Sequence, residues 1–82
     1  MMTPEKVETL IREGIPGAQV QVRSGDNVHF EAPVVRPGFA GRRPLQRHQQ
    51  VYGALGTLMG GEIHALALTT LTPDELAARD RV

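Results

Sequence analysis

Apolar residues recur every three to four positions in two parts of the chain, which is the spacing of a helix with one buried face. The first part begins at Thr3 and Pro4, an N-cap followed by a first-turn proline, and ends at Gly14. The second part begins at Pro44 and extends to about Met59. These patterns predict one helix at the N-terminal end and a second in the centre of the chain.

Two β-rich segments lie between these helices. Residues 18–22 alternate apolar and polar side chains, as in a strand buried on one face, and residues 28–35 form a second such run. The intervening residues 24–27 (Ser-Gly-Asp-Asn) are a dense turn signal, so the pair is predicted to be an antiparallel hairpin. Because proline donates no hydrogen bond to a sheet, Pro33 is expected at an edge or a bulge.

The run from Ile63 to Leu71 is the most strand-like segment, and its two mostly apolar faces favour a central strand. Thr72 and Glu75 then form a capping box that begins a short C-terminal helix. The predicted order α-β-β-α-β-α indicates an α+β fold, a three-stranded mixed sheet with helices packed mainly on one face. A helical crossover makes the last two strands parallel if they are neighbours. We expect a single domain over residues 1–82.

The chain contains no cysteine, so it can form no disulfide and supply no thiolate to a metal. Its first residues contain no apolar run, and we therefore expect a cytoplasmic protein with no signal peptide and no membrane association. No motif of a Ser, Cys or metal-dependent hydrolase is recognisable, and a domain of this size has little room for a deep substrate pocket. The sequence favours a binding protein over an enzyme.

Nine basic and nine acidic side chains cancel, which argues against a protein that coats nucleic acid. The charges are unevenly placed, however. Residues 32–61 contain no acidic residue but include Arg36, Arg42, Arg43 and Arg47. Such a cluster is usually a solvated surface. The alternative is a patch that binds phosphate, the carboxylates of glutathione or an acidic partner.

The sequence resembles the BolA family in three places: residues 29–31 (HFE) with 39–41 (FAG), residues 45–52 (LQRHQQVY), and residues 61–68 (GEIHALAL) with 71–75 (LTPDE). The similarity extends from Lys6 to Arg81, and the run from Ile63 to Glu75 is its most specific part. The Cys-free hairpin loop and residues 78–81 resemble the bacterial IbaG-like branch. The resemblance implies a class II KH-like fold, which agrees with the predicted order of elements.

The resemblance also implies a cytoplasmic partner of monothiol glutaredoxins that shares a [2Fe-2S] cluster with them. In such a pair the glutaredoxin and glutathione supply thiolates, and the BolA-like chain supplies a histidine of its third strand, which corresponds to His64. The family's second ligand is a His or Cys near the hairpin. Residues 24–27 contain neither, which leaves His29 as the nearby substitute. No cluster is expected in the isolated protein.

Each histidine also has a purely structural interpretation. His64 lies in an apolar run and can be a core residue whose ring is bonded to the backbone. His29 can be a strand-edge residue that shapes the turn, and His48 is expected on a helix surface. Neutral imidazole is a good iron ligand, and its replacement of a thiolate raises the potential of a cluster, which suits transfer or sensing.

Three functions are therefore compared. The leading hypothesis is an adaptor in iron–sulfur trafficking or in redox and stress regulation. The alternative is a nucleic-acid-binding transcriptional regulator, with DNA among its expected partners, that uses the KH-like fold and the helix carrying Arg42, Arg43 and Arg47. Two segments, residues 38–41 and 53–56, have GxxG spacing, but neither is predicted to join two helices as in a nucleic-acid-binding KH domain. The third hypothesis is an interaction module with structural histidines only.

Overall fold

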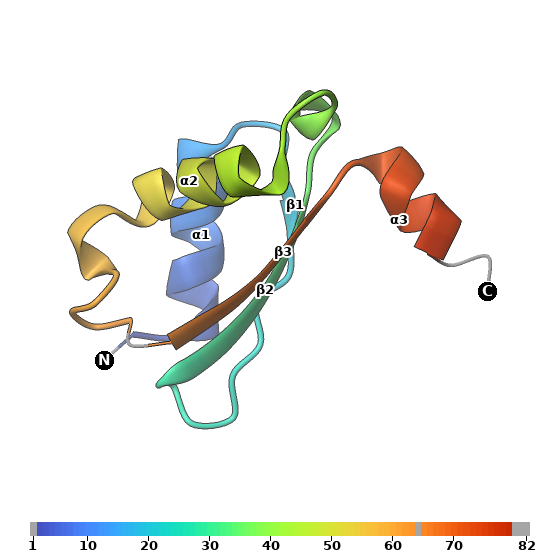
Figure 1. Ribbon diagram of the computed structural model, residues 1–82. Helices are drawn as coiled ribbons and strands as arrows, with labels where there is room; N and C mark the ends of the chain where they lie inside the picture. Colours follow the sequence, from blue (N-terminus) through green and yellow to red (C-terminus); the bar gives the residue numbers. More distant parts are fainter. Residues whose placement is uncertain (1, 64, 80–82) are drawn as a thin grey trace.

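The computed structural model describes residues 2–63 and 65–79, which form three α-helices and one three-stranded sheet (Figure 1). The helices are α1 (Pro4–Gly14), α2 (Pro44–Leu55) and α3 (Pro73–Arg79), and the strands are β1 (Gln19–Val20), β2 (His29–Val35) and β3 (Ala65–Leu71). Short 3-10 helices follow β2 (η1, Pro37–Phe39) and α2 (η2, Gly56–Leu58). The predicted order of elements and the α+β class are confirmed.

The sheet has the strand order β1-β2-β3, so β2 is its central strand. β1 pairs antiparallel with β2, and the hairpin is confirmed, although the β1 ladder is only two residues long. β3 pairs parallel with β2 in a register that places His29 opposite Ala65 and Val35 opposite Leu71. The mixed sheet and the parallel crossover are therefore confirmed.

The expectation of a central strand over residues 63–71 is wrong, because β3 is an edge strand of the described sheet. The apolar pattern has another origin. Leu66 and Leu68 pack against the core on one face, whereas the other face carries the small side chains of Ala67 and Thr69, which are exposed. Short side chains, and not strands on both sides, make both faces of β3 look apolar.

Pro33 lies in the central strand and not at an edge or a bulge, which corrects a second expectation. Its carbonyl accepts a hydrogen bond from the Gln21 amide (3.4 Å), so the backbone groups of Pro33 face β1. The alternate residues of β2 face β3, as the hydrogen bond from the Arg36 amide to the Leu71 carbonyl shows (3.0 Å). Because Pro33 has no N–H, one hydrogen-bond donor is missing on the side of β2 that faces the short strand β1. The long ladder of hydrogen bonds between β2 and β3 remains complete.

α1 and α2 lie over one face of the sheet, and the core is between the helices and the strands (Figure 1). The largest fully buried side chains are Phe30, Phe39, Ile11, Ile63, Val7, Val34 and Val51. The two helices approach closely at Gly14, where any side chain would collide with Ala54. α3 has no buried residue and follows the end of β3, so the helices pack mainly on one face, as expected.

The ends of the first two helices follow local chemistry. The Thr3 hydroxyl accepts a hydrogen bond from the Lys6 amide (3.3 Å), which confirms the predicted N-cap. α2 ends at Leu55, earlier than the expected end near Met59, because Gly56 adopts a positive φ of 59°. No helix in residues 2–63 and 65–79 is long and apolar enough to cross a membrane.

Candidate functional site

His29 stands at the start of β2, directly after the loop that connects the two hairpin strands. Its ring Nδ1 lies 2.8 Å from Oδ2 of Asp26. The other oxygen of Asp26, Oδ1, accepts hydrogen bonds from the amides of Val28 and His29, each 2.9 Å long. Ser24 fixes the same loop, since its hydroxyl donates to the His29 carbonyl (2.6 Å). The loop therefore holds the Asp26 carboxylate against the imidazole of His29.

The electrostatics of this pair favour an ionised Asp26. The hydrogen bond from the His29 side chain is the largest cause that lowers the pKa of Asp26 far below its usual range, followed by the backbone amides of His29 and Val28. The imidazole is well exposed, with 73% of its side-chain surface accessible. An ionised carboxylate on Nδ1 favours the tautomer with its proton on Nδ1, which leaves Nε2 as a lone-pair donor.

A shallow groove of about 720 Å³ lies beside His29, between the loop around Asp26 and the first residues of β3. Ala65 and Ala67 form part of its wall, so it opens on the face of the sheet that α1 and α2 leave free. The register places His29 opposite Ala65, which follows His64 in the sequence. His64, the predicted primary ligand, lies outside the described residues.

The donor set of the chain is compatible with a ligand role for His29 but does not form a complete metal site. Residues 2–63 and 65–79 contain no group of three or more His, Cys, Asp or Glu side chains placed to bind a metal ion. The whole chain has three histidines and no cysteine. A [2Fe-2S] cluster takes four protein or thiol ligands, so a cluster held here requires thiolates from another molecule.

The role of Asp26 is not evident from the sequence, where residues 24–27 indicate only a turn. A signal is nevertheless present, because an Asp three residues before a strand-opening His can reach both the backbone amides and the ring. A carboxylate that holds the second nitrogen of a histidine is common behind metal ligands. Asp26 therefore belongs to the candidate site together with His29.

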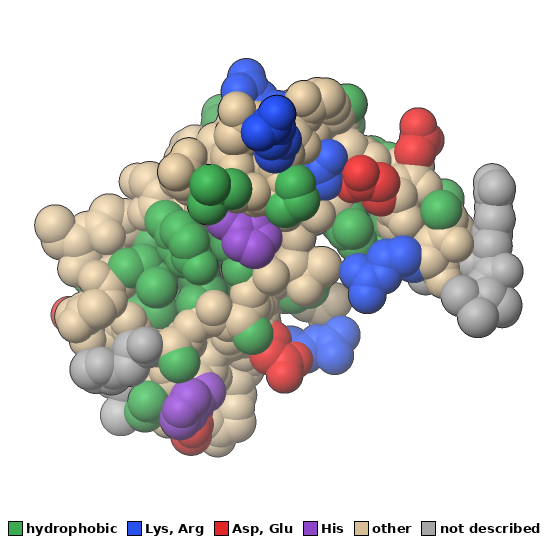
Figure 2. Space-filling model, in the orientation of Figure 1, with side chains coloured by type: hydrophobic (Ala, Val, Ile, Leu, Met, Phe, Trp, Pro, Cys, Tyr) green, Lys and Arg blue, Asp and Glu red, His purple; other side chains and the backbone are tan. Residues whose placement is uncertain are grey.

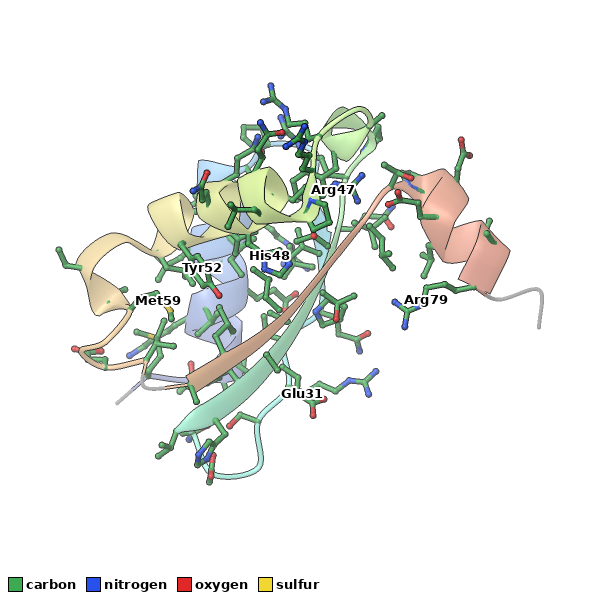
Figure 3. All side chains as sticks on the ribbon, viewed as in Figure 1. Glu31, Arg47, His48, Tyr52, Met59 and Arg79 are labelled. Atoms are coloured by element: carbon green, nitrogen blue, oxygen red, sulfur yellow. The ribbon has the colours of Figure 1, made fainter. Side chains whose placement is uncertain are left out.

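Arg47 is buried and does not lie on the exposed basic patch that the sequence suggested. Its side chain is only 9% exposed, and its guanidinium forms a bidentate pair with Glu75, at 2.6 Å (Nη1 to Oε1) and 3.2 Å (Nη2 to Oε2). It also donates to the carbonyls of Arg42 (3.0 Å) and Thr70 (3.3 Å). These contacts join α2 to β3 and α3 (Figure 3). Arg47 is thus a structural residue and not a free ligand for phosphate.

The remaining arginines of the predicted cluster lie near the start of α2, where Figure 2 shows basic side chains together. Arg36 is half-buried, with its guanidinium 5.9 Å from the centre of the Phe39 ring and hydrogen bonded to Gln50 (3.0 Å). Arg42 and Arg43 are exposed, and neither side chain has a carboxylate partner within the described chain. The candidate basic patch is therefore reduced to Arg42 and Arg43.

Glu75 connects this arrangement to the confirmed capping box of α3. Its Oε1 accepts from the Thr72 amide (2.8 Å), and the Glu75 amide donates to the Thr72 hydroxyl (3.1 Å). The hydrogen bonds from Arg47, and then that from the Thr72 amide, lower the pKa of Glu75 from 4.5 to about 2. One carboxylate thus caps α3 and binds the guanidinium from α2.

We expect Glu75→Gln to remove a pH-dependent part of the stability. The pKa of Glu75 is lower in the folded state, so its ionised form stabilises the fold fully above about pH 4.5, and this contribution is lost as the pH falls toward about 2. Chemical denaturation at several pH values should show wild type more stable than the variant at neutral pH, with the difference shrinking through this acid window. A difference that stays constant with pH would contradict this role of the carboxylate.

Three comparisons with known proteins bear on this arrangement. The family described as BolA-like protein matches residues 12–75. The chain is 46% identical over 52 residues to "BolA-like protein 1" of Homo sapiens, which covers 63% of this chain and 38% of that protein. It is 39% identical over 56 residues to the "DNA-binding transcriptional regulator BolA" of Haemophilus influenzae, covering 68% of this chain and 54% of that protein. It thus spans about two-fifths of the length of the human relative.

The solved structures agree with the sequence comparisons. A BolA protein homologue from Coxiella burnetii matches with a TM-score of 0.83 and 44% sequence identity. The match covers 94% of this chain and 99% of that chain. The sheet order, the crossover and the helical layer described above are therefore those of a known group of proteins.

Proposed function

This chain belongs to the BolA family, and from that premise we propose that it is a non-enzymatic partner of a monothiol glutaredoxin, with which it shares a [2Fe-2S] cluster. One observation of the structure carries this proposal. In a chain without cysteine, Asp26 holds the ring of an exposed histidine, His29, at the end of the sheet where β3 begins. Such a pair is suited to offer an imidazole nitrogen to a metal that another molecule brings.

The two histidines and Asp26 have distinct parts in this proposal. Nε2 of His29 makes no hydrogen bond to a described residue, and Asp26 orients the ring through Nδ1. His64, from the family resemblance, is the other proposed ligand. The bound cluster would supply an iron–sulfur centre with mixed imidazole and thiolate ligands, whose potential is higher than that of an all-thiolate centre. The chain itself contributes the imidazoles and the groove beside them.

The partner must supply what this chain lacks. Four ligands are needed, and two histidines leave two positions for thiolates, which a glutaredoxin cysteine and glutathione would fill. Thiolates remain reduced in the cytosol, so the proposal places the pair in the cytoplasm. A histidine ligand can be protonated, which breaks its bond to iron and suits trafficking of the cluster. The higher potential of a cluster with imidazole ligands suits the sensing of redox stress.

Anaerobic cluster reconstitution with a monothiol glutaredoxin and glutathione tests the proposal. The mixture should give absorption and circular-dichroism spectra that differ from those of the glutaredoxin alone, and one complex in size-exclusion chromatography. Asp26→Asn keeps an oxygen for the backbone amides but presents an amide to the His29 ring. We expect this variant to lose the cluster to a chelator about ten times faster, the lower limit for loss of such a supporting partner.

His48→Ala is the matched control, because His48 lies on α2 in an edge-to-face contact with Tyr52 and not at the candidate site. Its spectra and chelator kinetics should equal those of wild type. Spectra of the mixture that match the sum of the two separate proteins would overturn the proposed partnership. Wild-type kinetics in Asp26→Asn would instead remove Asp26 from the site and leave the partnership standing.

DNA binding is the second candidate function, favoured by the name of the Haemophilus influenzae relative and by the exposed side chains of Arg42 and Arg43, which form no ion pair with a described carboxylate. Under this alternative the chain would bind duplex DNA with an affinity that falls as salt rises. Arg42→Ala together with Arg43→Ala should reduce the slope of log affinity against log salt by about 2. Arg79→Ala on α3 is the control. Binding that is undetectable at low salt would exclude this function.

A further inference from the structure

β3 is an edge strand, and two hydrogen bonds show which of its backbone groups face away from the sheet. The Leu71 carbonyl accepts from the Arg36 amide at the end of β2, so Leu71 faces β2. The Thr70 carbonyl accepts from the Arg47 guanidinium and therefore faces outward. Because backbone groups alternate along a strand, those of Leu66 and Leu68 also face outward.

The outward edge of β3 lacks the features that usually protect an edge strand. Proteins place charged residues, proline or bulges on such edges to prevent pairing with other chains. The strand Ala65–Leu71 has the sequence ALALTTL, with no charge and no proline. Arg47 covers only the Thr70 carbonyl, and the outward groups of Leu66 and Leu68 have no hydrogen-bond partner in the described chain. This leaves a short open edge centred on Ala67.

The opposite edge of the sheet, formed by β1, is less suited to pairing with another strand. β1 has only two ladder residues, and beyond them the hairpin continues as an isolated bridge between Arg23 and Glu31. Both of those residues are charged and exposed. A partner strand is therefore better accommodated at β3, whose neighbouring surface on α2 includes the half-exposed Tyr52 (39% accessible) (Figure 3).

We infer that the open edge of β3 binds the β3 strand of a second copy of this chain, antiparallel about a two-fold axis at Ala67. In this register Leu66 of one copy lies opposite Leu68 of the other. Because both residues direct their backbone groups outward, the two Leu66–Leu68 pairs would form four hydrogen bonds. The product is a continuous six-stranded sheet, closed by symmetry and limited in length by Arg47 at Thr70.

The side chains are self-complementary in this arrangement. Ala67 is exposed on the free face of the sheet, and the two copies of it would lie opposite one another at a close, non-hydrogen-bonded position that suits a small side chain. On the other face, the partly exposed Leu66 and Leu68 of both copies would cover one another. No like charges meet, because the strand carries none.

This inference does not rest on the proposed glutaredoxin partnership, although Ala67 also lines the groove beside His29. The isolated protein is sufficient to test it. Sedimentation equilibrium of wild type should show a reversible monomer–dimer equilibrium between micromolar and millimolar concentrations. Ala67→Lys and Ala67→Glu should each be monomeric over this range, because each places two like charges directly opposite one another. An equimolar mixture of the two variants should form dimers again, since Lys then faces Glu.

Ala78→Lys on the exposed surface of α3 is the control, with the same change of net charge away from β3, and it should dimerise like wild type. The mixture also serves as an internal test of folding, because chains that fail to fold would not regain dimers on mixing. A wild type that stays monomeric at millimolar concentration would overturn the inference. So would a dimer that persists unchanged in Ala67→Lys.

Discussion

Replacing Phe39 with alanine is expected to lower the free energy of unfolding by about 3–5 kcal/mol, the range for removal of a fully buried aromatic ring. Phe39 is 0% exposed and lies in η1, the turn between β2 and α2. The guanidinium groups of Arg36 and Arg47 lie 5.9 and 5.7 Å from the centre of its ring. A domain of 82 residues has a thin core and little stability to spare, so much of this variant should be unfolded.

Urea denaturation followed by circular dichroism measures this effect. Phe39→Leu is the matched variant, because it keeps most of the apolar volume and should cost considerably less than the alanine substitution. The result also bears on the GxxG-like segment of residues 38–41, whose second residue is Phe39. A loss below about 1 kcal/mol for Phe39→Ala would show that this turn is not anchored in the core and is free to approach a ligand.

Replacing Arg47 with alanine is expected to lower the free energy of unfolding by about 2 kcal/mol, which lies within the range for hydrogen bonds that involve charged groups. The substitution removes the bidentate pair with Glu75 and the bonds to the carbonyls of Arg42 and Thr70. The Glu75 side chain is 44% exposed and can be rehydrated, so the cost stays below that of stranding a fully buried charge. α3 should lose order first, because Arg47 and the capping box hold it in place.

Arg43→Ala provides the comparison, since Arg43 is exposed and should change the stability by less than about 0.5 kcal/mol. Denaturation of both variants under the same conditions gives the difference. Equal changes in stability would contradict the structural role of Arg47 and would again make it a candidate member of the basic patch. If the expected difference is found, weaker DNA binding by an Arg47 variant would carry no information on a phosphate contact, because loss of structure would explain it.

The order of elements could be predicted because its signals are local. The Thr3 N-cap, the capping box at Thr72 and the alternation over residues 18–22 depend on neighbours within a few positions, and each corresponds to an element or a cap in the structure. The predicted end of α2 is too late, because the apolar spacing continues through Gly56 although the backbone leaves the helical conformation at this residue.

The sheet order and the role of Arg47 could not be predicted in the same way. Both depend on residues that are far apart in the chain, and Arg47 meets Glu75 across 28 positions. A single sequence shows that an arginine is charged, but it does not show that the folded chain brings a carboxylate into contact with it. The position of Pro33 is unpredictable for the same reason. A proline fits in the central strand here only because the neighbouring strand β1 is short, and the sequence around Pro33 does not show this.

The candidate site was predicted in part. His29 is exposed, as a partner-facing residue requires, but its ligand role stays a prediction, and His64 lies outside the described residues. The structure adds Asp26, which gives His29 a fixed ring orientation. In a sequence, His and Cys stand out as residue types that bind metals directly, whereas a carboxylate that only orients such a residue does not stand out.

Pulsed electron paramagnetic resonance of the reduced cluster, formed anaerobically from this chain, a monothiol glutaredoxin and glutathione, tests the central claim most directly. The account predicts hyperfine coupling to directly bound imidazole nitrogen, which is absent from the cluster of the glutaredoxin alone. The coupling should be lost in a His29→Ala, His64→Ala double variant and kept in His48→Ala. A spectrum of the mixture without nitrogen coupling, identical to that of the glutaredoxin's own thiolate-bound cluster, would contradict the claim that this chain binds the iron.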